Sequence, residues 1–162
     1  MSSSLRPVSA DDEEFLLRVY ASTRTEEMAL VPWSEEQKQT FLRMQFDAQR
    51  ASYQQQFPEA EYHVILDDGL PAGRLIVERS DKNILLIDIA LLPAFRNLGI
   101  GSRLIEDLKA EARASERPLW VDVEFFNPAQ HLYHRLGFEK IDEIGCYWRL
   151  EWRAGKEAAS NA

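Results

Sequence analysis

The stretch LLPAFRNLGIGSR, residues 91–103, constrains the fold more than any other part of this chain. A strongly apolar run over residues 84–92 leads into it and predicts a buried strand, which Pro93 ends. Apolar residues at helical spacing follow it and predict a helix with one apolar face, formed by Ile100, Leu104, Ile105, Leu108 and Ala112. The sequence therefore predicts a strand, a glycine-containing turn and the start of a helix in direct succession.

This succession is suited to binding an anion. The first turn of a helix has unpaired N–H groups and the positive end of the helix dipole, and glycines let a phosphate come close to the backbone. The spacing R-x-x-G-x-G from Arg96 to Gly101 is neither the dinucleotide motif G-x-G-x-x-G nor the phosphate loop that ends in Gly-Lys-Ser/Thr. Two interpretations remain: Gly99 and Gly101 make a tight turn, or residues 96–102 form a different pyrophosphate-binding loop, here called the cradle.

Composition sets the class of protein. A chain of 162 residues that is 45% hydrophobic is long enough for one domain with a sizeable core. The formal net charge of −8 argues against non-specific nucleic-acid binding. Cys146 is the single cysteine, so no internal disulfide is possible, and no apolar run is long enough to cross a membrane. We therefore expect a soluble, cytoplasmic, single-domain protein that binds neither nucleic acid nor membrane.

The N-terminal third predicts helices separated by a loop. Residues 1–4 should be flexible, and residues 5–8 are a candidate strand. Ser9, with an acid three residues later, is typical of a helix N-cap, and Ser34 with Gln37 forms the sequence pattern of a capping box. The segment 23–32 lacks helical periodicity and is expected to be a loop.

The rest of the chain predicts strands and helices in an α/β order. Strands are expected over residues 62–66, 73–79, 84–92, 119–123, 138–142 and 146–152, and a further helix over residues 128–136. Gly137 follows that helix at the position typical of a helix end. We expect one domain over residues 5–153 and a flexible tail over residues 154–162.

A second motif, NPAQHLYHRLGF at residues 127–138, resembles a signature of the GNAT superfamily of acyl-CoA N-acyltransferases. In that family Asn-x-x-Ala…Leu-Tyr-x-x-x-Gly-Phe follows the fifth strand, and Arg/Gln-x-x-Gly-x-Gly/Ala follows the fourth, as residues 96–101 do here. The order of elements matches the family from about Leu5 to Trp152. The resemblance implies a single-domain GNAT-like fold: a central mixed, mostly antiparallel sheet with splayed fourth and fifth strands and helices on both faces.

The resemblance also implies an N-acetyltransferase that uses acetyl-CoA and transfers the acetyl group to an amine by direct attack in a ternary complex. The main chain of Leu91 would donate its N–H to the acetyl carbonyl, a role in which one donor is worth about 3–4 kcal/mol. The residues expected to bind the cofactor are Ile89, Leu91, Arg96, Asn97, Leu98, Gly99, Ile100, Gly101, Ser102, Asn127 and Tyr133.

The acid and the base have competing candidates. Tyr133 occupies the position of the family's general acid, although it also fits the apolar face of its helix. Asp88 is the one charge in an apolar strand and ranks first as the base that deprotonates the amine, because a charge there needs a partner, water or a substrate. Glu78, and Glu26 or Glu27 in the predicted loop, are the alternatives; each also fits a solvated surface charge.

Several residues of the N-terminal third are candidates for binding the acceptor. Candidate contacts are Glu26, Glu27, Trp33 and Gln45, yet the aromatic residues around the second helix also fit a core. No metal is predicted, since His131 and His134 are more typical of a surface. The acceptor is expected to be a small-molecule or peptide amine, and the family commonly forms homodimers. The alternatives to an enzyme are a non-catalytic CoA-binding sensor and a protein-interaction module on the same fold.

Overall fold

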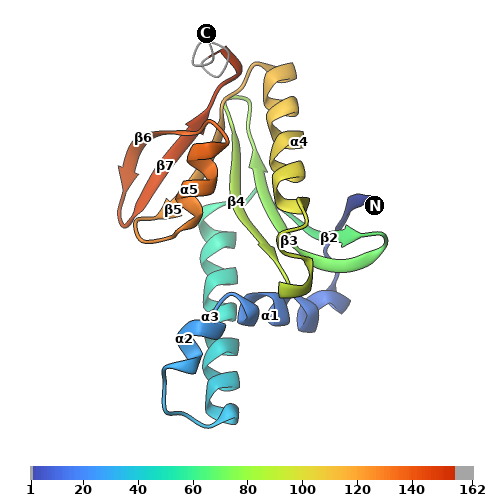
Figure 1. Ribbon diagram of the computed structural model, residues 1–162, viewed down its shortest axis with the longest axis vertical. Helices are drawn as coiled ribbons and strands as arrows, with labels where there is room; N and C mark the ends of the chain where they lie inside the picture. The colour runs from blue at the N-terminus through green and yellow to red at the C-terminus, as the bar shows by residue number, and fades with distance from the viewer. Residues whose placement is uncertain (1, 156–162) are drawn as a thin grey trace. The chain divides into compact units, whose positions relative to one another are not determined.

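The computed structural model describes residues 2–155 and has seven strands in one sheet, in the order β1-β2-β3-β4-β5-β7-β6 (Figure 1). The strands are β1 Ser3–Pro7, β2 Glu61–Asp67, β3 Leu70–Arg79, β4 Ile84–Leu91, β5 Leu119–Glu124, β6 Glu139–Ile144 and β7 Tyr147–Trp152. The helices are α1 Glu13–Ser22, α2 Thr25–Ala29, α3 Glu35–Gln56, α4 Ile100–Ser115 and α5 Ala129–Arg135, with short 3-10 turns at Ala10–Asp12 and Pro93–Phe95. From residue 156 onward, the predicted tail lies outside the described residues.

The pairing of the strands confirms the predicted mixed sheet. β1 pairs antiparallel with β2, and β7 pairs antiparallel with both β5 and β6. β4 and β5 run parallel, in register from Ile84 opposite Leu119 to Leu86 opposite Val121. This ladder holds three residue pairs, whereas the β5–β7 ladder holds six. A parallel ladder confined to the start of the two strands agrees with the splay that the resemblance implies.

The described chain forms two compact units. The first contains the residues up to Ile76 together with Asp88–Ile100, and the second contains Val77–Ile87 and the residues from Gly101. In the first unit, α1 crosses α3, and the core between them is built from Leu16, Tyr20 and Phe46 (Figure 1). α3 begins with the predicted capping box: the Gln37 N–H donates to the Ser34 hydroxyl at 3.1 Å, and the Ser34 N–H donates to the Gln37 side chain at 3.0 Å.

The second unit contains α4, α5 and the strands β5, β7 and β6 (Figure 1). The predicted apolar face of α4 is buried, as are Leu119, Val121 and Trp152. Lys109 of α4 is also buried; its ammonium lies 5.3 Å from the centroid of the Trp152 ring and donates to the carbonyl of Leu136. This contact attaches α4 to the end of α5.

In the N-terminal third, two segments differ from the sequence-based expectation. The segment expected to be a loop contains α2, a helix of five residues with no buried side chain, so it has no apolar periodicity that a sequence could show. β1 begins at Ser3, inside the stretch expected to be flexible, because Ser3 and Ser4 pair with Asp67 and Leu66 of β2. Pairing with a strand about sixty residues away orders this terminus.

Candidate active site

The lone acid of β4 has a cationic partner. Asp88 Oδ2 accepts a hydrogen bond from Arg74 Nε of β3 at 2.8 Å, and Arg74 Nη2 lies 2.5 Å from the same oxygen. Arg74 Nη2 also donates to Gln49 Oε1 of α3 at 3.2 Å. The Arg74 side chain is 7% exposed and that of Asp88 is 23% exposed. The charge in the apolar strand is therefore compensated by a buried guanidinium, which is one of the outcomes that the sequence left open.

Tyr62 of β2 is linked to the same network by electrostatics. Burial raises the pKa of its phenol, while the positive charge of Arg74 opposes that rise. Among the described residues, the Tyr62 hydroxyl has no hydrogen-bond partner although the oxygen is buried. Neither Arg74 nor Tyr62 was among the sequence-based candidates. The signal that could have identified Arg74 is its position as the one charge in the apolar run from Leu70 to Val77.

The cradle after β4 has the backbone that its glycines suggested. Asn97 and Gly99 have positive φ angles of 62° and 84°. A Cβ atom added at Gly99 would meet nothing within 4 Å, so the loop leaves open space at that point. α4 starts immediately afterwards at Ile100, and its first N–H groups follow the glycine. This geometry fits a pyrophosphate, because a bare backbone and a helix N-terminus meet next to free space.

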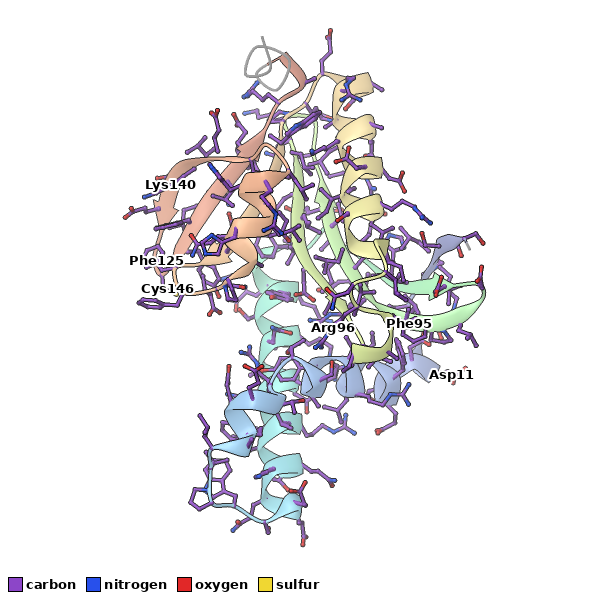
Figure 2. All side chains as sticks on the ribbon, in the orientation of Figure 1. Asp11, Phe95, Arg96, Phe125, Lys140 and Cys146 are labelled. Atoms are coloured by element: carbon purple, nitrogen blue, oxygen red, sulfur yellow. The ribbon has the colours of Figure 1, made fainter. Side chains whose placement is uncertain are left out.

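Arg96 joins the cradle to its neighbours in the first unit (Figure 2). Its Nε donates to the carbonyl of Leu91 at 2.9 Å, and its Nη2 lies 3.3 Å from both the carbonyl and the hydroxyl of Ser22. Ser22 is the last residue of α1. The Arg96 guanidinium thus connects the end of β4 with the end of α1, which α2 follows directly in the chain.

The second motif forms α5 and the turn before it. The Asn127 side chain accepts a hydrogen bond from the Ala129 N–H at 2.9 Å, which explains its position as a helix-starting residue. Tyr133 is buried, and its ring packs edge-on against Phe138 with centroids 5.4 Å apart. Gly137 closes the helix with a φ of 93°. The packed ring suits a residue on the apolar face of α5, and the hydroxyl is the group that a general acid would use. The position of Tyr133 is therefore compatible with both interpretations of the sequence.

The remaining acidic candidates lie elsewhere on the chain. Glu78 lies on β3 and is half-buried. Glu26 and Glu27 lie on α2 and are exposed, and Glu27 is paired with Arg24 at 3.2 Å. Gln45 of α3 accepts a hydrogen bond from the Tyr20 hydroxyl at 3.4 Å.

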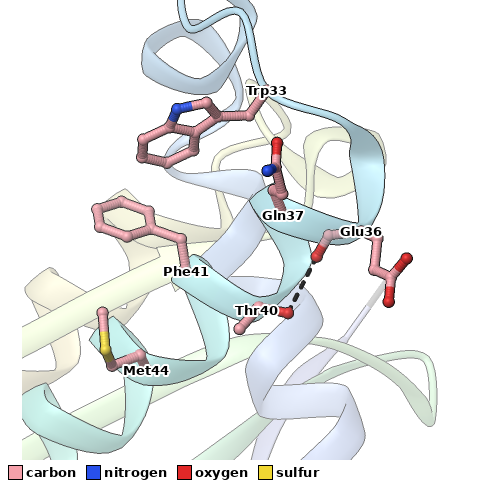
Figure 3. Close-up of a pocket in the computed structure, with 6 residues that line it drawn as sticks. All are labelled: Trp33, Glu36, Gln37, Thr40, Phe41 and Met44. Atoms are coloured by element: carbon pink, nitrogen blue, oxygen red, sulfur yellow. Dashed lines mark hydrogen bonds between the residues drawn. The ribbon is translucent and has the colours of Figure 1, made fainter.

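Trp33 lines an open pocket of about 420 Å³ on the N-terminal half of α3 (Figure 3). The other residues that line it are Glu36, Gln37, Thr40, Phe41 and Met44. The rings of Trp33 and Phe41 meet edge to face, with centroids 5.1 Å apart, and the carboxylate of Glu36 points away from them. Of the four residues predicted to bind the acceptor, Trp33 lines this pocket, whereas Glu26, Glu27 and Gln45 do not.

Comparison with known proteins assigns the family. Residues 58–140, just over half of the chain, match the family model "Acetyltransferase (GNAT) domain". The chain therefore belongs to the GNAT family of acetyltransferases and is an acyltransferase by family. No curated protein matches the sequence significantly.

Solved structures share the fold at low sequence identity. A PaiA N-acetyltransferase from Thermoplasma acidophilum in complex with coenzyme A is 19% identical with a TM-score of 0.67, over 94% of this chain and 99% of the other. An acetyltransferase from Thermus thermophilus is likewise 19% identical with a TM-score of 0.67, over 94% and 97% of the two chains. A GNAT family acetyltransferase from Elizabethkingia anophelis with acetyl-CoA bound is 18% identical with a TM-score of 0.56, over 93% and 97%. Within residues 2–155, no helix has the length and apolarity needed to cross a membrane.

Proposed function

We propose that this protein is an acetyl-CoA-dependent N-acetyltransferase that transfers the acetyl group to an amine by direct attack in a ternary complex. The observation that carries the proposal is the cradle, in which Gly99 leaves open space directly before the N-terminus of α4. The membership of the GNAT family and the similar folds of two enzymes solved with coenzyme A or acetyl-CoA support it.

The chain's own groups have distinct roles in this proposal. Backbone N–H groups of residues 96–102 bind the pyrophosphate, and the main chain of Ile89 and Leu91 binds the pantetheine arm. The Leu91 N–H donates to the acetyl carbonyl oxygen, where negative charge develops during attack. Bound acetyl-CoA supplies an activated thioester.

Two protons must move for the transfer to balance. The new bond joins the amine nitrogen to the acetyl carbon, and the carbon–sulfur bond breaks. Asp88 takes a proton from the amine, and Tyr133 gives a proton to the departing sulfur. The ion pair with Arg74 holds the Asp88 carboxylate at Oδ2. Glu78 and the two acids of α2, Glu26 and Glu27, remain the alternative bases. The proposed acceptor contacts are Glu26, Glu27, Trp33 and Gln45.

Thiol release tests the proposal directly. The protein is incubated with acetyl-CoA and a panel of amines that covers polyamines, amino acids, lysine peptides and peptide N-termini, and free thiol is measured with a colorimetric reagent. We expect release that depends on one class of amine, with the acetylated amine confirmed by mass spectrometry. Calorimetric binding of acetyl-CoA without turnover of any amine would instead favour a CoA-binding sensor. No binding at all would favour an interaction module.

A further inference from the structure

Gly73 of β3 lies closer to the end of β4 than a side chain would permit. A Cβ atom at this position would lie 2.1 Å from the carbonyl oxygen of Ala90 and 3.0 Å from the Cα atom of Leu91. The φ angle of Gly73 is not among the positive values of the chain, so its conformation does not require glycine. Space for the neighbouring backbone is therefore the reason that glycine is needed here.

This close approach defines the direction of the peptide between Ala90 and Leu91. Its carbonyl oxygen lies against Gly73, on the β3 side of β4. No cis peptide bond occurs among the described residues, and in a trans peptide the N–H points opposite to the C=O. The Leu91 N–H is therefore directed away from β3. The next N–H along the chain, that of Leu92, donates to the carbonyl of Ala72 on β3 at 2.9 Å.

We infer that Gly73 is a positioning residue, which acts by letting the Ala90–Leu91 peptide lie against β3 and so aims the Leu91 N–H. This inference rests on the proposed function, in which that N–H donates to the acetyl carbonyl. Gly73 itself need not touch either substrate. Its contribution is the absence of a side chain at the point where two backbones come together.

The size of the effect follows from the contact distances. Carbon and carbonyl oxygen in close contact are about 3.3–3.6 Å apart, so a Cβ atom at 2.1 Å must push the Ala90 carbonyl away by more than about 1 Å. Two of the three obstructing atoms belong to the backbone, and the third is Cδ2 of the Leu91 side chain at 3.0 Å. Neighbouring Ala72, Leu75 and Ile76 of β3 are buried, which leaves β3 little room to move. A displacement of about 1 Å in a catalytic group costs on the order of 10²-fold in rate.

The test compares Gly73→Ala with Gly155→Ala. An added Cβ at Gly155 meets nothing within 4 Å, and its φ is not positive, so this variant is a matched control for the same chemical change. We expect kcat to fall roughly 10²-fold in Gly73→Ala, with the KM for the amine within a few-fold of the parent and the control unchanged. A folded Gly73→Ala variant with parental kcat would overturn the inference. A lower melting temperature with normal kcat would show that Gly73 serves stability alone.

A measurement on the parent protein decides the case in which Gly73→Ala does not fold. Amide exchange followed by nuclear magnetic resonance should show the Leu91 N–H exchanging faster than the Leu92 N–H, which is bonded to Ala72. Addition of acetyl-CoA should slow exchange at Leu91. Equal protection of both amides before addition would overturn the assigned direction of the Leu91 N–H. If the parent acetylates no amine, the proposed function fails, and the exchange rates still test the direction of the Leu91 N–H separately.

Discussion

Replacing Asp88 with Asn tests the network that holds the proposed base. The substitution keeps the shape of the side chain and removes its charge, so that Arg74, whose side chain is 7% exposed, loses its anionic partner. Removing one partner of a buried ion pair costs about 3–5 kcal/mol, because the other charge stays buried without compensation. Asp88 is 23% exposed, and the Asn oxygen still accepts a hydrogen bond. We therefore expect a loss of about 2–3 kcal/mol in the free energy of unfolding.

This loss is large enough to measure by heat or denaturant. For a chain of 162 residues, 1 kcal/mol corresponds to about 2–4 °C in melting temperature, so Asp88→Asn should melt about 4–12 °C below the parent. The double variant Asp88→Asn/Arg74→Met removes both charges. If the unpaired guanidinium causes the loss, the double variant should be more stable than the sum of the single changes predicts. Additive losses would refute the reasoning, since the pair would then contribute no coupling energy.

Kinetics of the same variant separate catalysis from scaffolding. A base at Asp88 predicts a fall in kcat of roughly 10²–10⁴-fold, with the deficit largest at low pH, where unprotonated amine is scarcest. A residue that attracts the cationic amine changes KM and leaves kcat alone. A purely structural Asp88 lowers the melting temperature and leaves the kcat of the folded enzyme unchanged at every pH.

The matched control is a second strand-to-strand pair. Arg149 of β7 bonds Asp122 of β5 through Nε at 2.9 Å and Nη2 at 3.0 Å, with side chains 21% and 23% exposed. The Asp122 carboxylate raises the pKa of Arg149. Asp122→Asn should cost stability by the same mechanism and leave kcat unchanged. If both variants lose kcat equally, the loss reflects damage to the sheet and gives no support for a base.

Three further predictions address other parts of the molecule. Gly99→Ala should weaken acetyl-CoA binding strongly in calorimetry. The control is Gly69→Ala, which has the same φ of 84° and the same open space, so it should carry similar strain and bind acetyl-CoA normally. Equal effects of the two changes would remove the cradle from the cofactor site. Tyr133→Phe keeps the ring packed on Phe138 and should lower kcat roughly 10²–10⁴-fold with little change in acetyl-CoA affinity. A kcat within a few-fold of the parent value would show that Tyr133 only packs in the core. Hydrogen bonds from Arg6 and from the Ser9 N–H hold the pKa of Asp12 well below its ordinary value. The Asp12 carboxylate therefore stabilises the fold above the unfolded-state pKa of about 3.9, and this stabilisation is lost as the pH falls below that value. The stability difference between parent and Asp12→Asn in urea unfolding should thus be full at pH 7 and shrink in acid; a constant difference would contradict this account.

Local signals in the sequence determined several elements of this protein. A glycine-rich turn, an apolar face at helical spacing and a Ser-x-x-Gln box each depend on residues a few positions apart, so the start of α4 and of α3 could be predicted without any tertiary contact. The same holds for α5, because Asn127 and Gly137 mark its ends by backbone chemistry. The turn at residues 96–99 was predictable for this reason, and its binding of a pyrophosphate stays a prediction.

Tertiary structure alone decided how the strands support the candidate site. The partner of Asp88 is Arg74, fourteen residues earlier on another strand, and nothing in the local sequence shows which two side chains of adjacent strands will face each other. Gly73 is similar: its need for glycine comes from the backbone of Ala90, while its own φ would suit any residue. Such contacts depend on strand register and close approach, which are set by packing across the whole sheet.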